Sequence, residues 1–185
     1  MAEYYLISQL PSLDAIGDHT PIPITEERFL ELCNRFLKKK AWLELQNLTL
    51  IPTRTRKKSY SALVQSWNDG ERNLHLALGT VRADQMKKSF DTEKSLLPAE
   101  LLKIASAAAQ MENPLEAERF LFEYRLRFLE TLRPGDAFSE HFIFYYGLKL
   151  KLLLRMRAFD AAIGKEAYQN IYHSILNGEK LEAIK

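Results

Sequence analysis

The stretch Leu63–Ala83 constrains the fold of this 185-residue chain most, because two local signals in it conflict. Its middle, Asn68-Asp69-Gly70, is typical of a hairpin turn, since all three residue types tolerate positive φ angles. The flanking apolar residues nevertheless keep one helical phase straight through this point: Leu63, Trp67, Gly70, Leu74, Leu78 and Val81. Two strands joined by a hairpin turn would not need their apolar residues to keep a helical spacing across the turn. The pattern therefore predicts one long helix, from about Ser59 to Lys88, in which Gly70 lets a partner backbone or a large ring come close.

Composition favours a helical fold. The chain is 46% hydrophobic and 27% charged, and its seven glycines and seven prolines lie mostly between periodic segments. We expect an all-α protein, a bundle of packed helical hairpins around the long central helix. It would form a single all-helical domain over residues 1–185, or two lobes, 1–90 and 91–185.

Capping residues predict the clearest helix boundaries. Thr25 is a suitable N-cap for a helix from Glu26 to Lys40, whose last turn would carry three lysines that complement the helix dipole. Asn113-Pro114-Leu115-Glu116 supplies an N-cap, a proline at the first helical position and a capping-box acid for a helix that reaches about Leu132.

Ser139 predicts the start of a largely buried helix that continues to about Ala158. Its polar side would carry the basic residues Lys149, Lys151, Arg155 and Arg157. The remaining expected elements are a short docked segment at Tyr4–Pro11, a short helix within Ala41–Leu50, a helix that starts near Pro98, and a last helix over Gly164–Leu176.

The sequence contains no familiar catalytic signature. Phosphate-binding glycine loops, nucleophile elbows and paired cysteine or histidine ligands are absent, and the four histidines lie far apart along the chain. Acids and arginines do alternate within 116–127, but the Glu-x-x-His pairs of di-metal bundles are missing, so ion pairs along one helix explain them better. We expect no catalytic residue, no metal and no cofactor.

Several features favour a cytoplasmic location. The single cysteine, Cys33, falls in an amphipathic pattern and is expected to be a small buried residue in a reducing compartment. The apolar run at the N-terminus ends at Pro11, too early for a signal peptide. No stretch approaches the roughly 18 consecutive apolar residues of a membrane span.

Charge gives only a local indication of partners. The 26 basic and 24 acidic side chains leave a net charge of +2, which does not favour nucleic acid or an anionic membrane as the main partner. The densest basic cluster is Arg54-Thr55-Arg56-Lys57-Lys58. Only Tyr60 is close enough to stack on a base, so a solvated loop or a contact for an acidic protein surface is favoured over single-stranded nucleic acid.

Several segments in order along the chain resemble one family. They are Tyr4–Pro11, Trp67 with Glu71-Arg72-Asn73-Leu74, Leu78 and Arg82-Ala83, Asn113–Leu121 with Tyr124-Arg125, and Tyr146–Leu150. These resemble the short bacterial proteins encoded beside genes of V-type (A-type) rotary ATPases, which are themselves similar to the C subunit of that ATPase, known as the d subunit in eukaryotes. The chain is much shorter than that C subunit, and His75 stands where the family pattern often has arginine.

The resemblance implies an all-α, non-catalytic component of an ion-transport complex. In the V-type ATPase, the C subunit is a helical seat on the cytoplasmic side of the membrane rotor ring, and it receives the foot of the central stalk. The expected partners are therefore other ATPase subunits, with no nucleic acid and no small-molecule substrate, at the inner membrane through protein contacts. Candidate contacts are Arg54, Arg56, Lys57, Lys58, Arg72 and Arg82, because rim charges orient partners.

Two other function classes stay open. A free-standing helical adaptor would hold a partner helix in an exposed apolar groove. An enzyme with an unfamiliar site would need a deep pocket with converging polar groups and shifted pKa values.

Overall fold

The computed structural model describes residues 2–14, 16–17, 20–53, 58–88, 97–159, 169 and 171–173, and these residues form helices and connecting segments without a β-strand. The helices are α1 (Ala2–Gln9), α2 (Glu26–Phe36), α3 (Lys39–Gln46), α4 (Ala62–Gln85), α5 (Ala99–Gln110), α6 (Pro114–Thr131) and α7 (Glu140–Arg157). The expected all-α class is confirmed for this part of the chain. The predicted last helix lies outside the described residues, except that 169 and 171–173 are helical. None of the described helices is both long and apolar enough to cross a bilayer.

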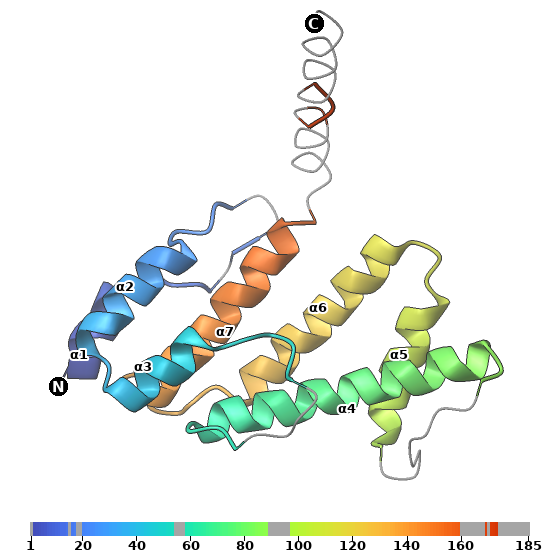
Figure 1. Ribbon diagram of the computed structural model, residues 1–185, viewed down its shortest axis with the longest axis horizontal. Coiled ribbons are helices and arrows are strands. Elements are labelled where there is room, and N and C mark those ends of the chain that lie inside the picture. The colour runs from blue at the N-terminus through green and yellow to red at the C-terminus, as the bar shows by residue number, and fades with distance from the viewer. Residues whose placement is uncertain are drawn as a thin grey trace, which may run out of the picture.

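The long helix passes through Asn68-Asp69-Gly70 without a reversal, as the sequence predicted. Figure 1 shows α4 extending along one edge of the molecule, from α3 and α7 at one end to α5 at the other. The expected N-caps are also present: Thr25, Asn113 and Ser139 accept hydrogen bonds from the N–H groups of Arg28, Leu115 and Phe142.

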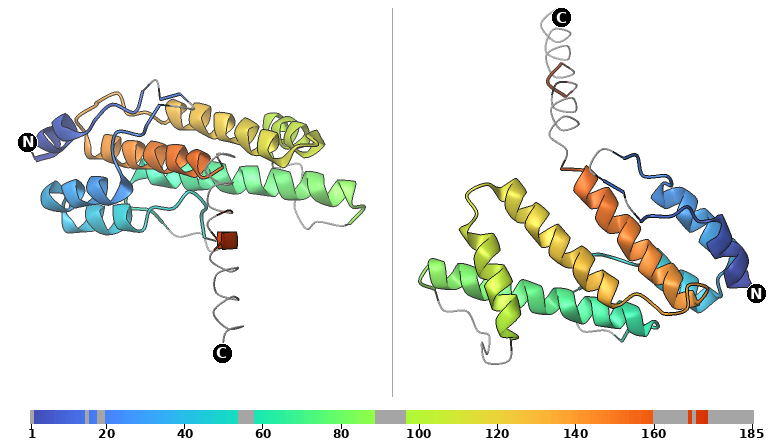
Figure 2. Two further views of the ribbon diagram at one scale, coloured as in Figure 1. Left: turned by 90° about the horizontal axis from the view of Figure 1, so that it is seen from above. Right: turned by 180° about the vertical axis from the view of Figure 1, so that it is seen from behind.

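Helix α7 is the centre of the larger apolar cluster. It packs against α2, α3, α4 and α6, and an almost unbroken run from Ile143 to Leu153 is buried. The views in Figure 2 place α7 between α6 and the pair α2 and α3. Gly147 permits this packing, because a Cβ atom there would lie 3.2 Å from Leu48 and from Phe29.

A second, smaller apolar cluster joins α4, α5 and α6. Leu74, Ala77 and Leu78 of α4 contact this cluster, whereas Leu63, Val64 and Trp67 belong to the larger one. Helix α4 therefore leaves one cluster and enters the other near Gly70. The division into lobes at residue 90 stays a prediction.

The predicted helix from Glu26 to Lys40 is wrong at its C-terminal end. Helix α2 ends at Phe36, and the backbone of Leu37 and Lys38 is extended before α3 begins. The change of direction lets α3 bury Ala41 and Leu45. Full burial of a side chain of the size of leucine contributes about 1.5–3 kcal/mol to the free energy of folding. The lysines 38–40 consequently lie at the start of α3, not at the end of a helix.

The predicted polar side of α7 also needs correction. Lys149 is buried, because Asp14 from the N-terminal segment and Glu130 from α6 reach its ammonium group. Lys151 pairs with Glu26 of α2. The basic residues of α7 thus connect it to other elements.

Candidate partner-binding groove

A groove of about 650 Å³ lies between α3, the start of α4 and the segment that joins them. Apolar side chains line it at Leu43, Leu48, Pro52 and Val64. Polar side chains surround these, from α3, from α4 and from the joining segment: Glu44, Asn47, Thr49, Thr53, Lys58, Ser59, Asn68 and Arg72. We call this feature the α3–α4 groove.

Glu44 fixes the geometry between the two helices that form the groove. Its carboxylate accepts hydrogen bonds from the backbone N–H groups of Tyr60 and Ser61, at 2.8 and 2.7 Å. These residues precede α4, where an acid also interacts favourably with the helix dipole. Ser61 is the N-cap residue but makes no side-chain capping bond. Glu44 of α3 therefore provides the acceptor that holds the start of α4.

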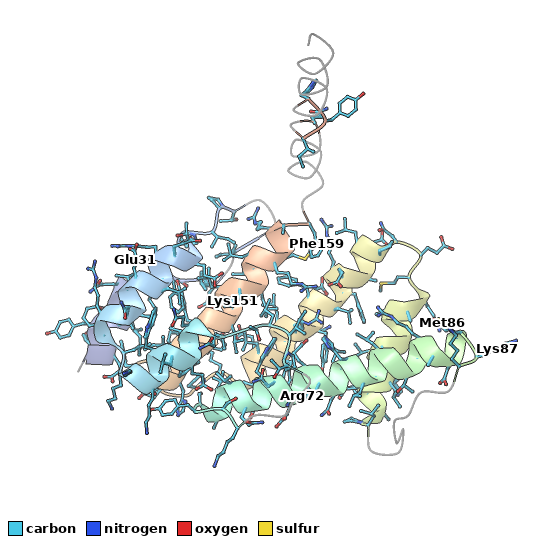
Figure 3. The ribbon with its side chains drawn as sticks, viewed as in Figure 1. Glu31, Arg72, Met86, Lys87, Lys151 and Phe159 are labelled. Atoms are coloured by element: carbon cyan, nitrogen blue, oxygen red, sulfur yellow. The ribbon has the colours of Figure 1, made fainter. Side chains whose placement is uncertain are left out.

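Polar residues of α4 hold the joining segment on the other side of the groove. Gln65 accepts a hydrogen bond from the N–H of Ser59 at 3.0 Å, and Asn68 donates to the Ser59 hydroxyl at 3.4 Å. Arg72 donates to the carbonyl of Thr53 at 3.0 Å and pairs with Asp69. Figure 3 shows Arg72 on the α4 ribbon. Each of these bonds joins the segment to a helix, so the described wall is held from several points.

Near the groove, the acidic side chains form hydrogen bonds within the protein, whereas three lysines are exposed. Glu44 and Asp69 accept the hydrogen bonds just described. Lys58 is exposed at the groove, and Lys39 and Lys40 are exposed one helical turn before Leu43 and Glu44 on the same face of α3. Within the described residues, these three lysines make no ion pair or hydrogen bond through their side chains.

The structure brings together some of the residues predicted to contact a partner. Lys58 and Arg72 both line the α3–α4 groove. Arg82 is exposed and lies ten residues further along α4, about 15 Å away at the helical rise per residue. Arg54, Arg56 and Lys57 lie outside the described residues. Of the predicted packing residues, Trp67 and Leu74 are fully buried.

A buried ion pair that was not predicted from the sequence joins α4 to α6. The Arg125 guanidinium donates from Nε to both carboxylate oxygens of Glu71, at 2.9 and 3.1 Å. His75 lies 3.6 Å from the same carboxylate. Burial raises the pKa of Glu71, although Arg125 opposes this effect. Arg125 thus lies 4.0 Å from Glu118 of its own helix, as ion pairs along the helix would predict, but its shorter ion pair joins it to α4.

The signal for this pair was present in the sequence. Glu71 is four residues after Trp67 and three before Leu74, so it lies on the apolar stripe of α4. Arg125 is four residues after Leu121 on the stripe of α6. Opposite charges on two stripes that both face inward are a reason to expect a pair between helices.

A second charged cluster lies under the N-terminal segment. Lys149 donates to Asp14 at 2.7 Å and to Glu130 at 2.9 Å, and Tyr145 donates to Glu130 at 2.6 Å. Burial alone would lower the pKa of Lys149, but the hydrogen bonds to both carboxylates raise it. Lys149 is therefore held as a cation, unlike a lysine that acts as a base or nucleophile.

The described cysteine and His141 also have structural surroundings. Burial raises the pKa of the Cys33 thiol to about 12, so the thiolate is disfavoured. The His141 ring lies 3.2 Å from the hydroxyl of Ser61. Among the described residues, no three histidine, cysteine or acidic side chains gather in a way that could hold a metal ion.

Comparison of the chain with protein-family models, with curated proteins and with solved structures gave no match.

Proposed function

We propose that this protein is a non-catalytic component of a V-type (A-type) rotary ATPase, a helical seat between the central stalk and the membrane rotor ring that resembles the C subunit. It would contribute to coupling ATP hydrolysis or synthesis to ion transport. It would be cytoplasmic and peripheral to the inner membrane through its protein partners. The observation that carries the proposal is the α3–α4 groove, where Lys58 and Arg72 lie beside the exposed apolar side chain of Leu43 on a firmly held surface.

Rigidity supports this role, because a component that transmits torque must not deform under load. The Glu71–Arg125 pair connects α4 with α6, and the Lys149 cluster connects α7 with α6 and the N-terminal segment. Lys151 adds a connection from α7 to α2. Such contacts between distant parts of the chain restrain the helices relative to one another.

The groove also has the composition of a recognition surface. Leu43, which lines the groove, is 47% exposed, and Ile51 and Tyr60, which belong to the joining segment but not to the lining, are about half exposed. Exposed apolar side chains within a polar, charged rim are typical of protein-binding sites.

A free-standing adaptor that binds a partner helix is the second candidate, and the same groove favours it. Apolar grooves between helices commonly accept the apolar face of another helix. The two candidates differ in the identity of the partner, not in the chemistry of the site. Gene neighbourhood separates them, since an ATPase component is expected beside genes for the catalytic and stalk subunits.

Affinity purification of the tagged chain from its native cell, in mild detergent, tests the proposal. We expect membrane ATPase subunits to co-purify. Leu43→Asp should weaken this association, because it places a charge among the apolar side chains of the groove. Leu76→Asp is the matched control, since Leu76 is also an exposed leucine, on α4 but outside the groove. Absence of ATPase subunits from the purified material would refute the rotary assignment.

A further inference from the structure

We propose that the α3–α4 groove recognises an acidic amphipathic helix of a partner protein. The inference rests on the proposed function in that it names the chemistry of the partner at the same site. The groove would hold apolar side chains of the partner, and the lysines at its rim would contact acidic residues beside them.

The placement of lysines in α3 is the first step. Lys38 is the N-cap residue without a capping side-chain bond, and Lys39 and Lys40 occupy the first two helical positions. The positive end of a helix dipole favours acids there, so three cations are unfavourable for the isolated helix. A negatively charged partner would reverse this effect, because the helix dipole and the lysines would then attract it together.

The charge of the groove is the second step. Glu44, the acid in its lining, already accepts two backbone N–H groups, and the neighbouring Asp69 accepts from Gln65 and pairs with Arg72. Lys39, Lys40 and Lys58 are exposed, and none of them bonds to another described side chain. The charges near the groove that no described side chain pairs with therefore include three lysines: Lys58 in its lining, and Lys39 and Lys40 one helical turn before Leu43 and Glu44.

The shape of the groove is the third step. Its apolar residues come from α3, from α4 and from the segment between them, and they line a hollow: Leu43 is exposed and Pro52 is partly exposed, whereas Leu48 and Val64 are buried. A helix presents apolar side chains at intervals of three and four residues on one face. A volume of about 650 Å³ suits a few such side chains, while the backbone of the partner helix stays at the rim.

This combination favours an acidic helix over nucleic acid. Single-stranded nucleic acid is bound by stacking of successive bases on several aromatic rings. Aliphatic residues line the α3–α4 groove, and its described lining includes no aromatic side chain.

Three designed peptides of about 20 residues, between about five and six helical turns, provide the probe. They share one leucine stripe and differ only in their flanking residues, which are glutamate, glutamine or lysine. We expect the glutamate peptide to bind the full chain about tenfold or more tightly than the glutamine peptide, by fluorescence polarisation. Added salt should reduce this difference, since exposed charges are screened. The lysine peptide should bind most weakly.

Charge reversal locates the binding site. The variant K39E/K40E/K58E should bind the glutamate peptide about tenfold or more weakly than the unmodified chain, whereas K87E/K88E/K103E should bind it unchanged. The control carries the same change in charge on exposed lysines, at the end of α4 and on α5 (Lys87 is labelled in Figure 3). Circular dichroism establishes that both variants remain folded.

Several results would overturn the inference: equal binding of the three peptides, no binding of the glutamate peptide, equal losses in both variants, or tighter binding of a single-stranded oligonucleotide. Its failure is separable from failure of the rotary assignment. If K39E/K40E/K58E still co-purifies with ATPase subunits, the groove inference fails and the assignment stands. If the peptide results hold but no ATPase component co-purifies, the groove inference stands for an adaptor.

Discussion

At Gly70, the absence of a side chain determines how closely α4 and α6 pack. A Cβ atom built there would lie 2.3 Å from Cε1 and 2.4 Å from Cζ of Phe128. The Phe128 ring also has Trp67 and Tyr124 as neighbours, with ring centroids 6.0 and 6.4 Å away. These two rings limit how far Phe128 can move to make room for a Cβ atom.

We therefore expect Gly70→Ala to lower the free energy of unfolding by about 1–3 kcal/mol, the range for overpacked cores. Alanine gains about 1 kcal/mol over glycine in an open helix, so even an unchanged stability would reveal strain. Urea unfolding measures the effect. Gly135→Ala is the control, because a Cβ atom there has no neighbour within 4 Å. A stability gain in Gly70→Ala would contradict the observed packing.

One residue after Gly70, the Glu71–Arg125 pair predicts unequal effects of its two single substitutions. Arg125→Met removes the guanidinium that pairs with the buried Glu71 carboxylate and leaves His75 beside it, and we expect a loss of about 3–5 kcal/mol. Glu71→Leu should cost less, because Arg125 also lies 4.0 Å from the partly exposed Glu118. The double variant should recover much of the loss. A double-mutant cycle in urea measures the coupling, and additive losses would show that the pair is unimportant.

The sequence could predict those helices whose signals are local. Helix α4 was predictable because its apolar phase is local, and Asn113 and Ser139 were predictable because capping involves neighbours in sequence. The break at Leu37 was not. Cys33, Leu37, Ala41 and Leu45 are spaced by four residues, so the helical phase continues across the break.

The pairing of Asp14 with Lys149 was equally hidden from the sequence, unlike that of Glu71 with Arg125. Asp14 and Lys149 are 135 residues apart, and nothing near either residue indicates that they meet. Within the groove, Lys58 and Arg72 were predicted as partner contacts from charge, whereas Leu43 and Glu44 were not predicted to line it. Their position depends on the direction of α3, which follows from the unpredicted break.

The start of α3 lacks a side-chain cap, which gives a testable prediction. Lys38 has the extended backbone of an N-cap residue, with φ −66° and ψ 149°, but no side-chain capping bond. Lys38→Ser should raise the free energy of unfolding by about 0.5–1 kcal/mol, since serine can accept a bond from the first turn. Thermal unfolding provides the measurement. Lys103→Ser, inside α5, should instead give a small loss. If Lys38→Ser also lost stability, Lys38 would have a role other than that of an uncapped N-cap.

On the scale of the whole molecule, the Lys149 cluster connects the N-terminal segment, α6 and α7, and it makes global stability depend on pH. The hydrogen bond from Lys149 is the main cause that lowers the pKa of Asp14. Partial burial alone would raise the pKa of Glu130, but hydrogen bonds from Tyr145 and Lys149 outweigh it and lower the pKa. Both carboxylates therefore bind protons less readily in the folded chain than in the unfolded chain.

The sign of the pH dependence follows from these lowered values. Stability from the two acids is fully present above their unfolded pKa values, which are about 4, and is lost as pH falls through the lower folded values. Urea unfolding between about pH 6 and pH 3 should show this loss. In Lys149→Met the acids lose their main cation, so the decline with acid should be shallower, although the variant is less stable throughout. Lys103→Met should retain the full slope because Lys103 is exposed on α5. Parallel curves for the unmodified chain and Lys149→Met would mean that the cluster does not set the response to acid.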